Sequence, residues 1–136
     1  MTIINWSKQF SVGIDSIDQQ HQKLIQLINQ LNHEIANGDA NIAVSQILNQ
    51  LTDYTEYHFQ FEEAMLDEFN YPSEQEHKDS HRALIRQLEG LKLNFESDIS
   101  GAIGLEIMQF LQSWLTEHIL KSDMAYSKFL ISKGAQ

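Results

Sequence analysis

The chain has 136 residues, enough for one domain with its own buried core, and its 19 acidic and 9 basic residues give a formal net charge of -10. This acidity argues against a nucleic-acid partner, because phosphate binding needs a surface rich in lysine and arginine. The absence of cysteine excludes disulfides and thiolate ligands, so any metal site must be built from histidine and carboxylate.

The N-terminal segment, MTIINWSKQF, lacks the pattern of a signal peptide, and no apolar run approaches the length needed to span a membrane. We therefore expect a soluble, cytoplasmic protein that does not bind membranes. We predict a single domain over residues 1–136, divided into an N-terminal arm (1–16) and a helical bundle (17–133).

The arm is predicted to lie over the bundle, because its apolar residues follow no helical period: Ile3, Ile4, Trp6, Phe10, Val12 and Ile14. Ser16 and Gln19 have the spacing of a capping box and predict that the first helix begins at Ile17. A line of inward-facing residues, here called a seam, then alternates spacings of four and three, as in a helix that faces a bundle. This first seam is Ile17, His21, Leu24, Ile28, Leu31 and Ile35, and Asn37 and Gly38 end the helix.

Two further seams follow with the same alternation. The second seam is Val44, Leu48, Leu51, Thr55, His58, Glu62, Met65 and Phe69, and its helix is stopped by Asn70, Tyr71 and Pro72. Ser73 and Glu76 form another capping box, which starts the third helix. The third seam is His77, His81, Leu84, Leu88, Leu91 and Phe95.

A connection of small residues from Ser97 to Gly104 leads into the fourth helix. The fourth seam is Ile107, Leu111, Trp114 and His118, and it continues toward Tyr126, Phe129 and Leu130. Four amphipathic helices with short connections predict an all-α fold, an up-down-up-down four-helix bundle.

Five of the six histidines lie on these seams, together with Glu62. A single histidine on an apolar face is usually a satisfied core residue. Burying a carboxylate without a partner is costly, however, and no seam lysine or arginine is available to pair with it. A bound metal cation would supply the missing charge. His33 lies off the first seam and is predicted to be a surface residue without a metal role.

The spacing of the polar residues also fits a metal site. His58 and Glu62 are four residues apart, as are His77 and His81, so each pair shares one face of a helix. In an up-down bundle these residues, His21 and His118 all fall at the same end.

Asp123 follows His118 by five residues, so on a regular α-helix their side chains diverge by about 140°. A π-type bulge would bring the two side chains together. Without such a bulge, Asp123 is a solvated surface residue. The spacing alone leaves both interpretations open.

Four motifs occur in order over nearly the whole chain: IDQQHQKLI around His21, HFQFEEAM from His58, HKDSH from His77, and WLTEHILKSDMAY with His118 and Asp123. With these motifs the chain resembles the hemerythrins, specifically their single-domain bacterial members. The resemblance implies two iron ions, one held by His77, His81 and His118 and the other by His21 and His58. Glu62 and Asp123 would bridge both irons, together with an oxo or hydroxo group.

The resemblance also implies reversible O₂ binding at the iron that has only two histidines. The role would be oxygen storage, transport to an oxygen-using enzyme, or scavenging. Reversible binding requires a dry pocket, and the resemblance implies that the apolar residues beside the ligands form it: Leu24, Phe59, Trp114, Leu115 and Ile119. These residues are equally expected as part of the core. Tyr126 either donates a hydrogen bond to Asp123 or is an ordinary packed tyrosine.

Other functions stay open at this point. Oxygen-activating ferritin-like sites use a Glu-x-x-His motif on each of two helices, whereas here only Glu74 and His77 fit this motif within the site segment. A nitrogen-rich site favours binding over activation, so we predict that the protein is not an enzyme. The alternatives are a di-iron peroxidase or nitric-oxide-handling enzyme and a sensor of O₂, redox state or iron. Histidine and carboxylate also suit zinc or manganese, so iron rests on the resemblance.

Overall fold

A computed structural model describes residues 4–37, 41–97 and 103–134 of the chain. Its long helices are α1 (Asp15–Asn37), α2 (Asn41–Glu68), α3 (Glu74–Ser97) and α4 (Ile103–Glu117). A π-helical segment, η2 (His118–Asp123), continues α4 directly into α5 (Met124–Ser132). A short 3-10 turn, η1 (Lys8–Phe10), lies in the N-terminal arm.

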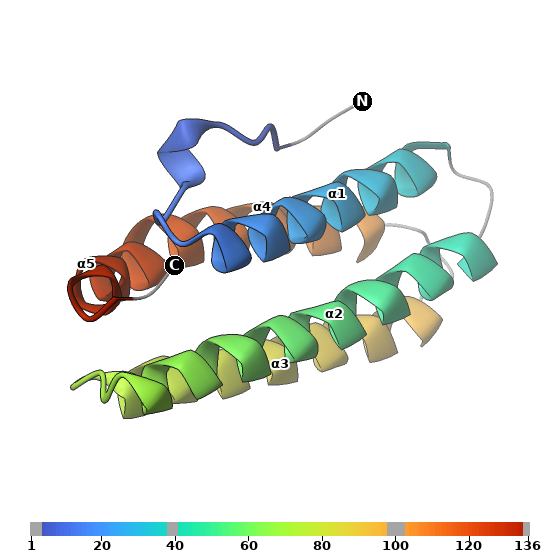
Figure 1. Ribbon diagram of the computed structural model, residues 1–136. Coiled ribbons are helices and arrows are strands. Elements are labelled where there is room, and N and C mark those ends of the chain that lie inside the picture. Colours follow the sequence, from blue (N-terminus) through green and yellow to red (C-terminus); the bar gives the residue numbers. More distant parts are fainter. Residues whose placement is uncertain (1–3, 38–40, 98–102, 135–136) are drawn as a thin grey trace.

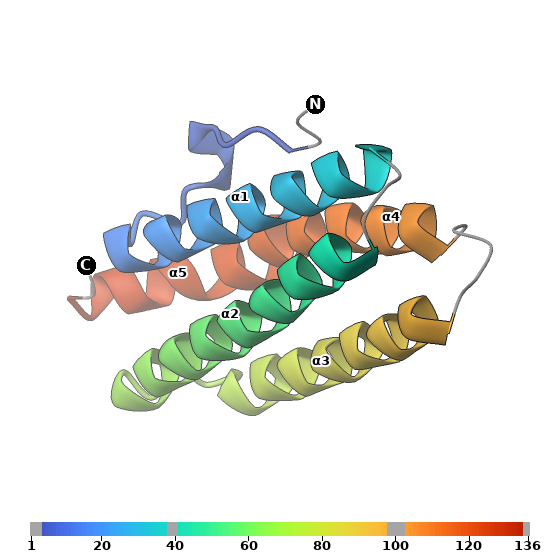
Figure 2. The same ribbon diagram turned by 90° about the vertical axis from the view of Figure 1, so that its right-hand side faces the viewer.

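The predicted four-helix bundle is confirmed. Successive long helices run in opposite directions, and each packs against two neighbours, α1 against α2 and α4, and α3 against α2 and α4 (Figures 1 and 2). The passage from α2 to α3 and the passage from α4 to α5 lie at the same end of the bundle as the start of α1 (Figure 1). Within the described residues, no helix is both long and apolar enough to cross a membrane.

Most residues of the predicted seams are buried, and the others are partly buried, such as Ile35, Leu91 and Phe95. Two details of the prediction are corrected. Helix α1 begins at Asp15, two residues earlier than predicted from the capping box at Ser16. The carboxylate of Asp18 accepts hydrogen bonds from the backbone of Val12 and the hydroxyl of Ser11, which ties the helix start to the arm. On α2, Leu66 rather than Met65 takes the fully buried position after Glu62, so the predicted step of three is a step of four.

The chain connections can be compared only in part. Helix α1 ends at Asn37, as predicted, while Gly38 lies outside the described residues. Helix α3 begins at Glu74, directly after the predicted cap residue Ser73. The connection predicted from Ser97 to Gly104 is shorter, because α4 begins at Ile103; residues 98–102 of it lie outside the described part of the chain.

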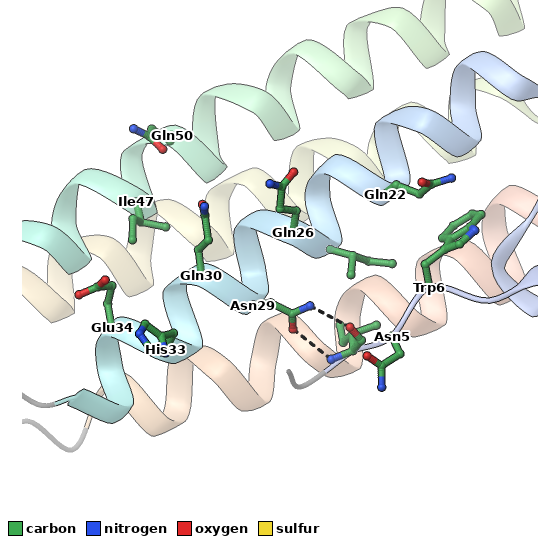
Figure 3. Close-up of a pocket in the computed structure, with 12 residues that line it drawn as sticks. Asn5, Trp6, Gln22, Gln26, Asn29, Gln30, His33, Glu34, Ile47 and Gln50 are labelled. Atoms are coloured by element: carbon green, nitrogen blue, oxygen red, sulfur yellow. Dashed lines mark hydrogen bonds between the residues drawn. The ribbon is translucent and has the colours of Figure 1, made fainter. Parts of the chain in front are cut away.

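The arm lies along the outer side of α1, as predicted. The side-chain amide of Asn29 on α1 makes two hydrogen bonds with the backbone of Ile4, one to its N–H and one to its carbonyl (Figure 3). Between the arm, α1 and α2 lies a groove of about 870 Å³, and half of its lining residues carry amide side chains, with Trp6 at one end (Figure 3). The turn η1 contacts η2, so the arm also covers the π-helical segment.

The core is divided into two apolar clusters. The long cluster extends along the bundle from Ile119 in η2 and includes Leu24, Leu48 and Leu111. The short cluster closes the other end; it consists of Val12, Ile14, Ile17, Leu66, Tyr126 and Leu130, with partly buried aromatic residues packed around it. Along α1, Ile17 belongs to the short cluster and Leu24 to the long one, so His21 between them marks a polar layer that separates the two.

Candidate metal centre

The polar layer contains all seven residues that the sequence singled out as metal ligands. They come from α1, α2, α3 and the π-helical segment η2 that continues α4, and all are buried: His21, His58, Glu62, His77, His81, His118 and Asp123. The seam periodicity explains six of them, because each replaces an apolar residue at an inward-facing position. Their side chains lie in two groups that share Glu62, and within each group the nearest donor atoms are within 4.8 Å of one another.

Asp123 reaches the layer because the helix changes its winding. The six residues His118–Asp123 form a π-helix rather than an α-helix. A π-helix has more residues per turn, so a spacing of five returns Asp123 to the side that His118 faces. The predicted bulge is confirmed, and Asp123 is fully buried rather than solvated.

The two carboxylates divide their oxygen atoms between two sets of histidines. Oε1 of Glu62 lies 2.5 Å from Nε2 of His77 and 3.2 Å from Nε2 of His81, while Oε2 lies 2.8 Å from Nε2 of His58. Oδ1 of Asp123 lies 3.1 Å from Nε2 of His118, while Oδ2 lies 2.8 Å from Nε2 of His21.

This division defines a three-histidine group (His77, His81 and His118) and a two-histidine group (His21 and His58). Each carboxylate turns one oxygen toward each group, which is how a carboxylate that bridges two cations is arranged. Atoms bound to a single ion at about 2.0–2.2 Å lie within roughly 4.4 Å of one another, close to the spacing of 4.8 Å within each set.

Several inward-facing atoms are buried without any hydrogen bond of acceptable geometry. They include Nε2 of His21, His58, His81 and His118, Oε2 of Glu62 and both carboxylate oxygens of Asp123. Buried polar atoms in folded proteins are nearly always hydrogen-bonded, because leaving one unsatisfied costs free energy. Lone pairs that converge without partners fit a cation in their midst.

The electrostatics of the layer favour charged carboxylates. Burial alone would raise the pKa of Glu62, but the histidines around it, His58 first, outweigh burial and hold the pKa well below its usual value. The pKa of Asp123 is also lowered, because His118 and His21 outweigh burial and the nearby Glu62. Burial lowers the pKa of His58, which favours its neutral, ligand-competent form.

His118 shows the opposite behaviour. Burial acts against its charged form, but the Asp123 carboxylate, together with Glu62, outweighs burial and raises the pKa. The Asp123 carboxylate therefore favours the protonated form of His118. A cation bound between the two would replace that proton.

Two residues in contact with the layer were missed by the sequence reasoning. Oε1 of the buried Gln20 lies 2.6 Å from Nδ1 of His58, and Oε2 of Glu63 lies 2.9 Å from Nδ1 of His81. Both residues are chain neighbours of a predicted ligand, Gln20 of His21 and Glu63 of Glu62. Adjacency in sequence is the only signal that could have found them, since neither lies on a seam.

The five residues of the predicted apolar pocket are buried or partly buried, but the aromatic ones lie against the three-histidine group. The ring of Phe59 stacks on His81 with a centroid distance of 3.7 Å, and Trp114 stacks on His118 at 5.3 Å. Leu24, Leu115 and Ile119 belong to the long apolar cluster. The aliphatic members therefore form one set in the long cluster, and the aromatic members form a wall on the three-histidine side.

The remaining candidates are also placed. The hydroxyl of Tyr126 is buried without a hydrogen-bond partner, so the hydrogen bond suggested toward Asp123 is not observed. Burial, with the carboxylates of Asp123 and Glu62 nearby, raises the pKa of Tyr126 well above its usual value. His33 is exposed, as predicted. Glu74 belongs to neither group of donor atoms, and it lies 3.8 Å from Lys78 on the next turn.

Fold and site together define a helical-bundle protein with a buried histidine and carboxylate centre able to hold metal ions. Residues 12–130 match the family model of the hemerythrin HHE cation binding domain. The chain belongs to the hemerythrin family.

Individual relatives agree with this assignment. A bacteriohemerythrin from Stenotrophomonas maltophilia is 35% identical over 129 residues, covering 93% of this chain and 81% of the relative. A hemerythrin-like protein from Naegleria gruberi is 33% identical over 126 residues, covering 93% of this chain and 92% of the relative. A crystal structure of wild-type hemerythrin superposes with a TM-score of 0.86 at 26% identity, covering 95% of this chain and 98% of that one.

Proposed function

We propose that the protein binds O₂ reversibly at a carboxylate-bridged di-iron centre, with the seven residues of the polar layer as ligands. The observation that carries the proposal is the division of the Glu62 and Asp123 oxygens between the three-histidine and the two-histidine groups. When bound, the di-iron group supplies the redox chemistry of reversible O₂ binding.

The residues of the chain make the two halves of this centre unequal. One half has three imidazoles and the other has two. Each carboxylate turns one of its two oxygens toward each half. An equal division of five histidines is impossible. If both ions took the same number of ligands, the ion in the two-histidine half would have one protein donor fewer, and O₂ would be expected to bind there.

Apolar side chains lie on both sides of the centre along the bundle. The short cluster closes the bundle below the layer, and Leu24, Leu115 and Ile119 lie in the long cluster on its other side. A dry site favours release of O₂ unchanged, because reversible binding fails where water can deliver protons to a reactive intermediate. These apolar neighbours support a binding protein for storage, delivery or scavenging rather than an enzyme.

The proposal can be tested by loading the protein with Fe(II) under anaerobic conditions and then titrating it with O₂. We expect one iron for each group of donor atoms, a visible absorption band that grows with O₂, and loss of that band under vacuum. A His33→Ala variant should behave like the wild type, since His33 is exposed and outside both groups. Immediate oxidation by air that vacuum does not reverse would contradict O₂ carriage.

The enzyme alternative needs a separate assay. Turnover of hydrogen peroxide or nitric oxide by the iron-loaded wild type should not exceed that of a His77→Ala variant, which loses one ligand of the three-histidine group. Turnover that depends on His77 would favour a peroxidase or a nitric-oxide-handling enzyme instead.

A further inference from the structure

Two of the candidate ligand histidines are held from outside the centre through their second ring nitrogen. His81 turns Nε2 toward Glu62 and Nδ1 toward the carboxylate of Glu63, with an Nδ1 to Oε2 distance of 2.9 Å. His58 turns Nε2 toward Glu62 and Nδ1 toward Gln20, at 2.6 Å. The two outer partners differ in charge, since one is a carboxylate and the other a neutral amide.

This difference in charge affects whether the tautomer of each imidazole is fixed before a metal binds. An ionised carboxylate only accepts hydrogen bonds, so Glu63 requires a proton on Nδ1 of His81. In a neutral imidazole, that proton leaves the lone pair of Nε2 pointing into the centre. The amide of Gln20 can accept or donate, depending on how its side chain is turned, so it is compatible with both tautomers of His58.

The packing around His81 adds to the effect of Glu63. The Phe59 ring lies parallel to the His81 imidazole, with an angle of 3° between the planes. His81 is thus held on its face by Phe59 and at its edge by Glu63. In the two-histidine group, by contrast, Nδ1 of His21 is buried without a hydrogen-bond partner.

We propose that Glu63 is a positioning residue that fixes the tautomer and orientation of His81 and so makes the three-histidine group the more firmly prepared half of the centre. The inference rests on the proposed role of His81 as a metal ligand. The two groups should therefore differ in how fast they release a metal ion. The ion in the three-histidine group should be released more slowly than the ion in the two-histidine group.

The position of Glu63 makes this inference accessible to mutation. Glu63 is about one-quarter exposed and lines a surface pocket of about 380 Å³ between α2 and α3, with Phe59 and His81 among its other lining residues. Glu56 lines the same pocket on α2 but belongs to neither group of donor atoms. Glu56 therefore provides a matched control of the same charge and the same helix.

Release of Zn(II) to a chelator tests the inference without any O₂ chemistry. We expect the slower of two release phases to quicken by about 10- to 100-fold in Glu63→Ala, since loss of an outer partner typically weakens metal binding by that factor. Glu63→Gln, which keeps an acceptor but loses the charge, should fall between Glu63→Ala and the wild type. Glu56→Ala should release Zn(II) at the wild-type rate.

Proton NMR of the Zn(II)-loaded, ¹⁵N-labelled protein gives a readout that a merely structural role of Glu63 would not move. The wild type should show a slowly exchanging Nδ1–H proton on His81, and Glu63→Ala should lose it while the resonances of the long cluster stay in place. Glu56→Ala should keep the signal.

The outcomes separate this inference from the proposed function. A wild-type protein that takes up no Zn(II) would overturn the proposed metal centre and the inference together. A wild type that takes up the metal, with Glu63→Ala and Glu56→Ala indistinguishable in release rate and in the Nδ1–H signal, would overturn the inference alone.

Discussion

The polar layer and the long apolar cluster occupy the same kind of position in the bundle but affect stability in opposite ways. His21 and Leu24 are one turn apart on α1, and both are fully buried. Burying a leucine side chain stabilises the fold by about 1.5–3 kcal/mol. Burying polar and charged groups without full hydrogen bonding costs free energy.

Equally buried residues in the layer and in the cluster therefore contribute to the protein in different ways. The long cluster tolerates changes among apolar residues of similar volume, because its contribution is not directional. The polar layer depends on lone-pair direction, as the facing oxygens of Glu62 and Asp123 illustrate. The stability of the metal-free fold should therefore come mainly from the long cluster. The polar layer should bind the metal, and it should stabilise the fold only when the metal is bound.

Metal loading is the change with the largest expected effect. A metal at about 1,000 times its dissociation constant contributes about 4 kcal/mol to the folded state, which corresponds to a rise in Tm on the order of 10 °C for a chain of this size. Calorimetry of the metal-free and the Fe(II)- or Zn(II)-loaded protein measures this rise. His58→Ala should lose much of it, and an undiminished rise in that variant would contradict the assignment of His58.

A cavity in the long cluster should have the reverse effect. Leu48→Ala removes a fully buried side chain and should lower the free energy of unfolding in urea by about 3 kcal/mol. Metal content per folded chain should stay at the wild-type value, because Leu48 is outside the layer. The control is Leu93→Ala, whose side chain is 66% exposed and whose expected change is about 0.5 kcal/mol or less.

A lowered metal content in folded Leu48→Ala would contradict this separation of roles between the cluster and the layer. It would mean that the cluster also sets the geometry of the ligands. Titration with Zn(II) at a temperature where the variant is fully folded separates this outcome from loss of metal through unfolding.

Most of the fold could be predicted because the seams are periodic. Six of the ligands could be found because they are polar residues at seam positions where apolar residues are expected. His21, His58 and Glu62 were recognisable as polar residues on apolar lines, and the all-helical bundle follows from the same lines. Asp123 was different. A spacing of five from His118 allowed two interpretations, and the choice depends on the backbone winding of η2, which the pattern of side chains does not fix.

The parts that could not be predicted depend on side-chain direction or on contacts between distant segments. The start of α1 at Asp15 follows from the hydrogen bonds that join Asp18 to the arm. Gln20 and Glu63 lie off the seams, and periodicity gives the face of a helix but not the rotamer that turns a side chain back toward a ligand.

The pH dependence of the metal-free protein should be the smallest of these effects, and it should arise in the layer. The pKa of Glu62 is lowered in the folded state relative to its ordinary value of 4.5, because His58, His77 and His81 outweigh burial. The unfolded chain therefore binds more protons at this carboxyl in acid. The resulting stability is present above the ordinary pKa and is lost as the pH falls through the lowered folded-state value.

At pH values above the range in which Glu62 titrates, His58 and His118 change the free energy of unfolding in opposite directions. The lowered pKa of His58 removes stability as the pH falls below about 6.5, whereas the raised pKa of His118 adds stability there and loses it as the pH rises through the folded-state value. Because these two effects oppose each other, the net acid dependence below about pH 5 should follow the carboxylates. Urea unfolding of the metal-free protein from about pH 5 to about pH 3 should show a smaller loss of stability in Glu62→Gln than in the wild type. A Leu48→Ala variant should keep the wild-type slope, since Leu48 belongs to the long cluster and not to the polar layer. Equal slopes in Glu62→Gln and the wild type would place the acid sensitivity outside the layer.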